Sequence, residues 1–209
     1  MEKDCKKSSD FIIKDYICNG SNKVKLKRLL MTHLTKRLYF TTTTVVDWID
    51  IFSRPRYRYV IIESLDYCRQ HKGLHIYAWV LMTNHLHIVA GTEEGQSISD
   101  ILRDFKKFTN KKIIEILEQD ERESRRDWML EHFLSAGAAG SHNQKYRFWQ
   151  DGNHVEEIYT LKFLSQKIDY VHNNPVKAEF VARAEDYLYS SAPNYAGDKG
   201  LLDVEVVTL

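Results

Sequence analysis

Residues 75–91, with the sequence HIYAWVLMTNHLHIVAG, decide the fold expected for this chain. They contain two runs of β-type residues, 76–82 and 85–90, on either side of the polar pair Thr83-Asn84. Two such runs joined by a short polar turn are typical of a β-hairpin. The sequence therefore predicts a hairpin of two antiparallel strands over this segment.

The second strand of the hairpin carries His85 and His87. Because side chains alternate along a strand, both imidazoles are expected on one face and Leu86 on the other. Two nitrogens held on one rigid strand form half of a site for a divalent metal. The pair alone is weak evidence, because chance pairs with this spacing are common in a chain with nine histidines.

Outward from the hairpin, apolar periodicity and capping residues predict the remaining elements. A helix that ends near Asn174 is expected because Pro175 restricts the residue before it. The expected elements are a strand that starts within 38–52, a helix from Pro55 towards Gly73, a long helix capped by Ser97 and running to 119, a second helix over 121–135, a flexible loop over 136–140, a short strand over 146–150 and an amphipathic helix over 156–173.

The composition is that of an ordinary globular protein, with 43% hydrophobic and 28% charged residues in a chain of 209. This length suits one domain, which we expect over residues 31–209, after a weakly ordered arm or added helix over 1–30. The chain has no apolar run long enough for a bilayer, and its first ten residues do not resemble a signal peptide. Three cysteines without a C-x-x-C pair favour a reducing, cytoplasmic location.

The net charge of +1 does not by itself indicate a nucleic-acid-binding protein. Basic residues nevertheless cluster locally, and the usual role of such clusters is to solvate a helix face. The alternative is that they contact DNA phosphates. The candidates for that role are Arg54, Arg56, Arg103, Lys106, Lys107 and Lys111.

Tyr170 and Asn174 form a second candidate pair, because residues four apart share one face of a helix. A tyrosine hydroxyl, with an ordinary pKa of about 10, is a poor nucleophile. It becomes effective when it is positioned against a phosphodiester that a metal has polarised. With twelve tyrosines in the chain, a role in the core or on the surface is the alternative.

Together these segments resemble the IS200-like and REP-associated tyrosine transposases, over about residues 36–197. Members of that family carry a His-hydrophobic-His (HUH) motif after Met-x-Asn, as in Met82-Thr83-Asn84, and a later helix with the nucleophilic tyrosine. The segments that match are WVLMTNHLHIVA at 79–90, YVHNNPVKAEFV at 170–181 and the aromatic-Ser-Ser segment YLYSS at 187–191.

The resemblance implies an α+β fold, an antiparallel sheet with helices on one face, similar to ferredoxin-like and RNA-recognition folds. It implies that His85 and His87 bind one Mg²⁺ or Mn²⁺ ion. It further implies that Tyr170 attacks the scissile phosphate of single-stranded hairpin DNA, which leaves a 5′-phosphotyrosine and a free 3′-OH. The expected activity is that of a single-strand DNA endonuclease and strand transferase in transposition or recombination.

The same resemblance selects Asn174 as third metal ligand, since relatives carry a polar side chain four residues after the tyrosine. A helix-capping role is the alternative for Asn174. His172, His154 and Asp151 are rival ligands.

Three functional interpretations follow: the active enzyme, a catalytically silent protein that binds REP hairpins, and an unrelated or structural-zinc protein. A closed zinc site needs four nitrogen or sulfur ligands, and no cysteine lies near His85 or His87 in the sequence. By its length and its extension after Tyr189, the chain resembles the monomeric REP-associated group, with Tyr170 acting in cis. A dimer is the alternative, and no membrane partner is expected.

Overall fold

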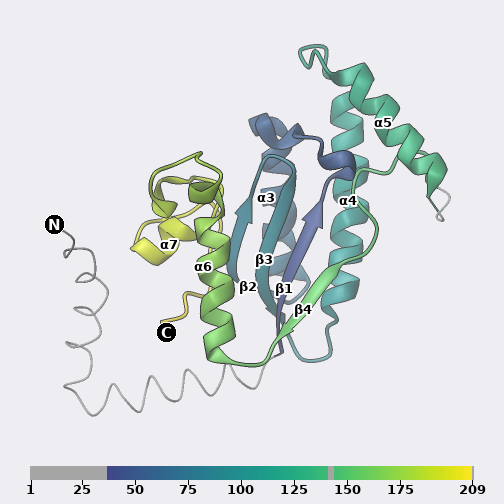
Figure 1. Ribbon diagram of the computed structural model, residues 1–209. Helices are drawn as coiled ribbons and strands as arrows, with labels where there is room; N and C mark the ends of the chain where they lie inside the picture. The colour runs from purple at the N-terminus through teal and green to yellow at the C-terminus, as the bar shows by residue number, and fades with distance from the viewer. Residues whose placement is uncertain (1–36, 141–143, 209) are drawn as a thin grey trace, which may run out of the picture. The chain divides into compact units, whose positions relative to one another are not determined.

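The computed structural model describes residues 37–140 and 144–208, and the expected arm over residues 1–30 lies outside them. Four strands form one antiparallel sheet in the order β2-β3-β1-β4 (Figure 1). The strands are β1 (Leu38–Thr44), β2 (Leu74–Leu81), β3 (His85–Thr92) and β4 (His154–Ile158). The hairpin expected at 76–90 is thus confirmed as β2 and β3, which are neighbours in the sheet.

The two faces of the sheet are set by alternation along β3. Leu86 and Ile88 belong to one buried cluster, and Val89 belongs to the cluster on the other face. His85 and His87 have the same parity as Val89, so they lie on the Val89 face. In β2, a bulge between Ile76 and Ala78 resets this alternation.

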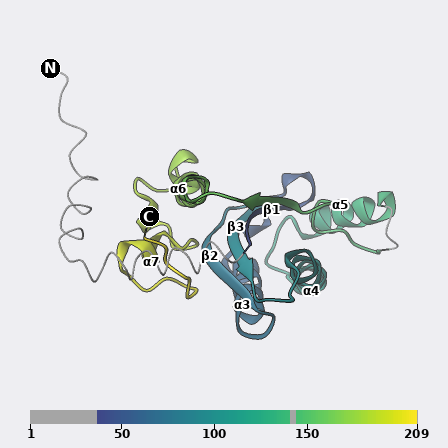
Figure 2. The same ribbon diagram turned by 90° about the horizontal axis from the view of Figure 1, so that it is seen from below.

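Helices cover both faces of the sheet (Figure 2). On one face α3 (Pro55–His71) packs beside α4 (Ile98–Glu118), and α5 (Arg126–Ala139) packs against α4. On the other face α6 (Leu161–Lys177) packs against β2, β3 and β4. The α+β fold class is therefore confirmed, but the expectation of helices on one face alone was wrong. The apolar side chains Leu164, Ile168 and Val171 of α6 bury the second face.

Two of the long helices begin with a side-chain cap, at Ser97 and at Thr160. The Ser97 hydroxyl accepts a hydrogen bond from the Asp100 backbone N–H at the start of α4. The Thr160 hydroxyl does the same for Phe163 at the start of α6, at 3.1 Å. Residues 156–158, expected in this helix, instead belong to β4.

The expectation that this helix ends near Asn174 was wrong, because α6 runs through Pro175 to Lys177. A proline inside a helix removes one backbone donor. The next turn still forms: the Ala178 N–H donates to the Asn174 carbonyl, and the Phe180 N–H to the Pro175 carbonyl. The chain then leaves the helix at Glu179, which has a φ of 59°.

Two shorter expectations were also wrong. Residues 136–139, expected in a loop, form the last turn of α5, with Ala136 and Gly137 buried. Residues 146–150 form no strand apart from one isolated bridge between Val45 and Trp149. Buried Phe148 and Trp149 hold this segment in the core by side-chain packing.

The chain after α6 continues along the open edge of β2. It contains the short helices η3 (Ala184–Asp186) and α7 (Ala192–Ala196). Between them, the Leu81 N–H donates to the Tyr189 carbonyl and the Ser191 N–H to the Trp79 carbonyl, each at 2.9 Å. The aromatic-Ser-Ser segment therefore covers a sheet edge that would otherwise expose unpaired backbone groups.

Among the described residues, no helix combines the length and the apolar composition that crossing a bilayer requires.

Candidate active site

His85 and His87 are held in place through the Nδ1 atoms of their rings. Thr42 lies directly across from His87 in the sheet, and its Oγ1 is 2.8 Å from His87 Nδ1. The Nδ1 atom of His85 is 2.6 Å from Oδ1 of Asn84. A hydrogen bond to one ring nitrogen fixes the orientation of an imidazole and leaves the other nitrogen for a ligand. The otherwise unusual run of threonines in β1 thus has a structural role at Thr42.

Tyr170 of α6 reaches the same place on the sheet. Its hydroxyl oxygen is 3.5 Å from Nε2 of His87, and the centroids of the two rings are 5.2 Å apart. The Phe40 ring meets the Tyr170 ring edge-on. Tyr170 is nevertheless 41% exposed, so part of the residue is accessible to solvent.

One turn further along α6, Asn174 forms a side-chain hydrogen bond with His85. Because α6 stays helical through Pro175, the amide of Asn174 stays on the same helix face as Tyr170. The structure therefore brings His85, His87, Tyr170 and Asn174 together, within a single chain.

Both imidazoles are neutral at neutral pH. Burial, together with the nearby His85 and Lys167, lowers the pKa of His87 to about 3. Burial also lowers the pKa of His85, against the opposing effect of its hydrogen bond with Asn174. Neutral imidazoles keep the lone pairs that a metal ion needs.

The donor set fits a divalent metal ion with open coordination positions. Within the described part of the chain, no three His, Cys, Asp or Glu side chains come together as a metal site. A metal at this place would be held by the two imidazoles and the amide oxygen of Asn174, a hard donor suited to Mg²⁺ or Mn²⁺. The hydrogen bonds that orient both rings support this assignment.

The rival ligands lie elsewhere or have other partners. Nε2 of His172 is 2.8 Å from the Ser191 hydroxyl, in the core between α6 and the C-terminal segment. His154 lies on β4 across from Thr42, two strands away from His87 in the sheet, and is exposed. Asp151 forms an ion pair with Arg147 at 2.5 Å.

Two lysines on α6 were missed by reading the sequence. Lys167 and Lys177 lie three residues before and seven residues after Tyr170, a spacing that places all three on one helix face. Nζ of Lys177 is 5.8 Å from the centre of the Tyr170 ring. Nζ of Lys167 is 4.2 Å from the centre of the Phe40 ring and forms an ion pair with Glu156. The helical spacing was the signal that could have identified them.

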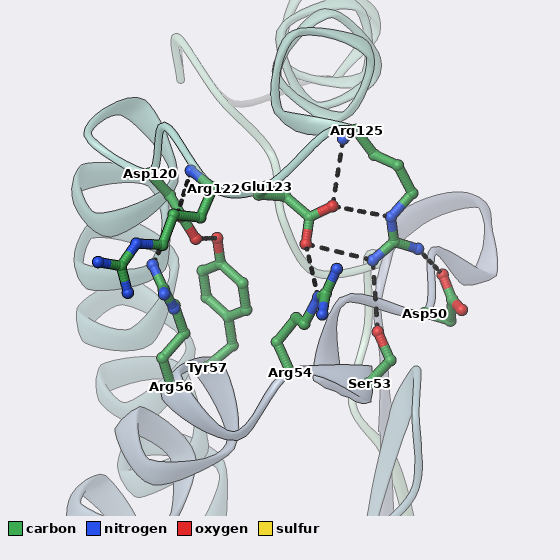
Figure 3. A network of polar contacts seen from close by, with 9 residues as sticks. All are labelled: Asp50, Ser53, Arg54, Arg56, Tyr57, Asp120, Arg122, Glu123 and Arg125. Carbon is green, nitrogen blue, oxygen red and sulfur yellow. Dashed lines mark hydrogen bonds and ion pairs between the residues drawn. The ribbon is translucent and has the colours of Figure 1, made fainter.

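The basic residues expected to contact DNA are not brought to this site. Arg54 and Arg56 form ion pairs with Glu123 and Asp120, as Figure 3 shows. The α4 candidates lie in the helical layer on the opposite face of the sheet. Three of them have partners within the chain. Arg103 forms an ion pair with Asp100 and Lys111 with Glu115, and Lys106 donates to the carbonyls of Gln150 and Gly152. The fourth, Lys107, is exposed.

Because His172 is buried, we expect the stability of the fold to decrease at acidic pH. Nε2 of His172 is 2.8 Å from Ser191 Oγ, which accepts a hydrogen bond from the Trp79 N–H and donates one to the Trp79 carbonyl. Burial lowers the pKa of His172 to about 4, so below about pH 6.5 the unfolded chain binds a proton that the folded chain does not. Stability should therefore fall as the pH drops from about 6.5 to about 4, with a contribution from His172 of up to ~3 kcal/mol.

Urea unfolding across this pH range checks the prediction. His172→Gln keeps a polar side chain that does not titrate, and its stability should fall less steeply than that of the wild type. His154→Gln, at an exposed position, is the matched control and should follow the wild type. An equal pH dependence for His172→Gln and the wild type would count against the neutral, buried state of His172.

The fold and the grouped side chains define a class of structure: an α+β domain whose sheet presents a histidine pair to a tyrosine on a covering helix. No family model and no curated protein sequence matches the chain. Among solved structures, its fold is similar to that of a REP-associated tyrosine transposase bound to a REP hairpin. The similarity covers 83% of this chain and 88% of that chain, with a TM-score of 0.52 and 21% sequence identity. The chain thus resembles REP-associated tyrosine transposases in its fold as well as in its sequence motifs.

Proposed function

We propose that this chain is a metal-dependent, single-strand DNA endonuclease and strand transferase that acts on hairpin DNA of the REP type. The observation that supports this most is the 3.5 Å approach of the Tyr170 hydroxyl to Nε2 of His87 within one chain. On the same grounds we propose that the chain is a member of the REP-associated tyrosine transposases, whose motifs it resembles. The solved relative in complex with a REP hairpin supports the choice of hairpin DNA.

In this proposal, His85, His87 and Asn174 hold one Mg²⁺ or Mn²⁺ ion. When bound, that ion supplies positive charge against the oxygens of the scissile phosphate. The oxygen of Tyr170 attacks the phosphorus, its proton passes to solvent, and the bond from phosphorus to the 3′ oxygen breaks. The products are a 5′-phosphotyrosine and a free 3′-OH, and attack by another 3′-OH reverses the step as strand transfer.

Positioning and charge are the main contributions that a protein makes to such a transfer. Lys167 and Lys177 flank Tyr170 on the α6 face, and we propose that they guide the DNA backbone to it. Contacts from Arg54, Arg56, Arg103, Lys106, Lys107 and Lys111 would lie further along the DNA, outside the reacting centre.

The proposal is tested by incubating the full chain with a single-stranded oligonucleotide that forms a REP-like hairpin, in the presence of Mn²⁺. A denaturing gel should then show a covalent protein–DNA adduct and a released 3′-OH fragment. Hairpin binding without any adduct would instead support the alternative, a catalytically silent hairpin-binding protein.

Because Tyr170 and the histidine pair meet within one chain, we propose that cleavage takes place in cis and that the protein acts as a monomer. Light scattering at micromolar concentration should give the mass of one chain. In a mixture of two inactive variants, Tyr170→Phe and His87→Ala, cleavage should not return. A stable dimer, or restored cleavage in the mixture, would contradict action in cis.

A further inference from the structure

The segment between β1 and α3 presents an exposed indole beside the candidate active site. Trp48 is 59% exposed, and its ring meets the His85 ring edge-on with the centroids 6.0 Å apart. Its neighbours in sequence are mostly buried: Val46, Ile49 and Ile51 all belong to the core. The apolar residues on either side of Trp48 are therefore buried, while Trp48 itself is exposed to solvent.

The backbone at this point is strained. Asp47 has a φ of 51° and Trp48 a φ of 56°, in the left-handed region that residues other than glycine rarely adopt. Two successive residues of this kind persist only where the surrounding structure holds them, and they occur preferentially at functional sites. An exposed tryptophan in this conformation has no evident role in the core.

Backbone hydrogen bonds fix both ends of the segment to the turn between β2 and β3. The Val45 N–H donates to the Asn84 carbonyl, and the Phe52 N–H donates to the Thr83 carbonyl, each at 2.9 Å. The position of Trp48 is therefore set relative to the same turn that precedes His85.

The Asn84 side chain couples Trp48 to the histidine directly. Its Nδ2 donates to the Trp48 carbonyl at 3.1 Å, while its Oδ1 is 2.6 Å from Nδ1 of His85. One amide group thus fixes both the strained backbone and the orientation of the candidate metal ligand.

Arg125 holds the far side of the segment, as Figure 3 shows. Its Nη1 is 2.5 Å from Asp50 Oδ1, and its Nη2 is 3.3 Å from Ser53 Oγ. Its Nε donates to Glu123, a buried carboxylate that also accepts from Arg54. This arginine therefore ties the segment to the start of α5.

We propose that Trp48 is a stacking platform for an unpaired nucleobase next to the scissile phosphate, and that Arg125 positions it. The inference rests on the proposed function and adds a specific DNA contact to it. An indole that lies beside the site where the phosphate is expected suits the flat face of a base, and such stacking tolerates any base. A rigid platform loses little conformational freedom when the strand binds, which favours binding.

The test uses equilibrium binding, read by anisotropy of a labelled oligothymidylate with one 2-aminopurine at its centre, in Mg²⁺. The host is the full chain with Tyr170→Phe, so that no cleavage occurs. Trp48→Gly removes the ring but suits the left-handed backbone, so the fold should keep or gain thermal stability. Tyr67→Ala is the matched control, because Tyr67 is an exposed aromatic on α3, across the sheet from the site.

Trp48→Gly should weaken binding by about tenfold to a hundredfold and should abolish the quenching of 2-aminopurine, whereas Tyr67→Ala should change neither. Trp48→Phe should restore part of both. Arg125→Gln should also weaken binding, but by much less when Trp48 is already glycine, because a positioning residue acts through the ring that it positions.

Three results would overturn the inference. If the host protein binds the oligonucleotide and Trp48→Gly binds it equally well, the platform is wrong while the proposed function stands. Losses from Arg125→Gln and Trp48→Gly that simply add would show that Arg125 contacts DNA itself and does not position Trp48. If the host binds neither this oligonucleotide nor a hairpin, the proposed function fails, and the platform fails with it.

Discussion

Replacing Tyr170 with phenylalanine is expected to abolish the covalent DNA adduct while leaving the fold and hairpin binding nearly unchanged. The substitution removes the hydroxyl oxygen, which lies 3.5 Å from Nε2 of His87, and keeps the ring that packs against Phe40 and His87. Because the side chain is 41% exposed, the free energy of unfolding should change by about half a kcal/mol or less. Adduct formation on a denaturing gel and thermal unfolding measure the two effects.

The matched control is Tyr159→Phe. Tyr159 is 74% exposed and its hydroxyl bonds to Glu157 on β4, so its loss should leave the adduct intact. If Tyr170→Phe still forms an adduct, another tyrosine is the nucleophile, with Tyr159 and Tyr187 the next to test. The buried Tyr187 hydroxyl donates to the Leu81 carbonyl, which makes it the poorer candidate.

Replacing His87 with alanine is expected to stop cleavage by a different route, through loss of metal affinity. The ring is buried, bonded to Thr42 and adjacent to Tyr170, so the substitution removes one of the two proposed imidazole ligands. Loss of a residue that only hydrogen-bonds to a metal ligand lowers metal affinity or activity by about ten- to a hundredfold. Removing the proposed ligand itself should therefore lower the cleavage rate by at least about a hundredfold. Raising the Mn²⁺ concentration should restore part of the activity of His87→Ala but none of that of Tyr170→Phe.

A chelator provides the corresponding test on the wild type. Treatment with EDTA should stop adduct formation, and added Mn²⁺ or Mg²⁺ should restore it. Cleavage that persists in EDTA would contradict a metal site at His85, His87 and Asn174, whichever tyrosine reacts.

The β2–β3 hairpin could be predicted because its signals are local, whereas β4 was expected in part as helix. The alternation around His85 and His87 and the polar turn at Thr83-Asn84 determine the hairpin within seventeen residues. The start of α4 at Ser97 followed in the same way from a side chain that reaches only three residues ahead.

The features that the sequence left undetermined depend on packing. Pro175 predicts a helix end from local sterics, but burial of α6 against the sheet sustains the helix for another turn. That extra turn keeps Asn174 and Lys177 on the Tyr170 face. Periodicity along α6 likewise identified its apolar side without showing which face of the sheet would receive it.

The candidate site was predicted in part. The motifs named His85, His87, Tyr170 and Asn174, and the fold places them together. The hydrogen bond between Thr42 and His87 depends on the register of β1 against β3, which no local pattern encodes. The left-handed conformation of Trp48 could not be predicted either, because the residue at this position is not glycine, which is the usual sequence signal for a positive φ.

The central claim is that Tyr170 becomes covalently joined to the 5′ phosphate of cleaved hairpin DNA. The most direct measurement is mass spectrometry of the adduct, after nuclease trimming and proteolysis, to locate the residue that carries the nucleotide. The account predicts a single modified peptide in which the phosphate is attached to the Tyr170 oxygen and to the 5′ end of the DNA. A nucleotide on any other residue, a linkage to the 3′ end, or cleaved DNA without any covalent link would contradict it.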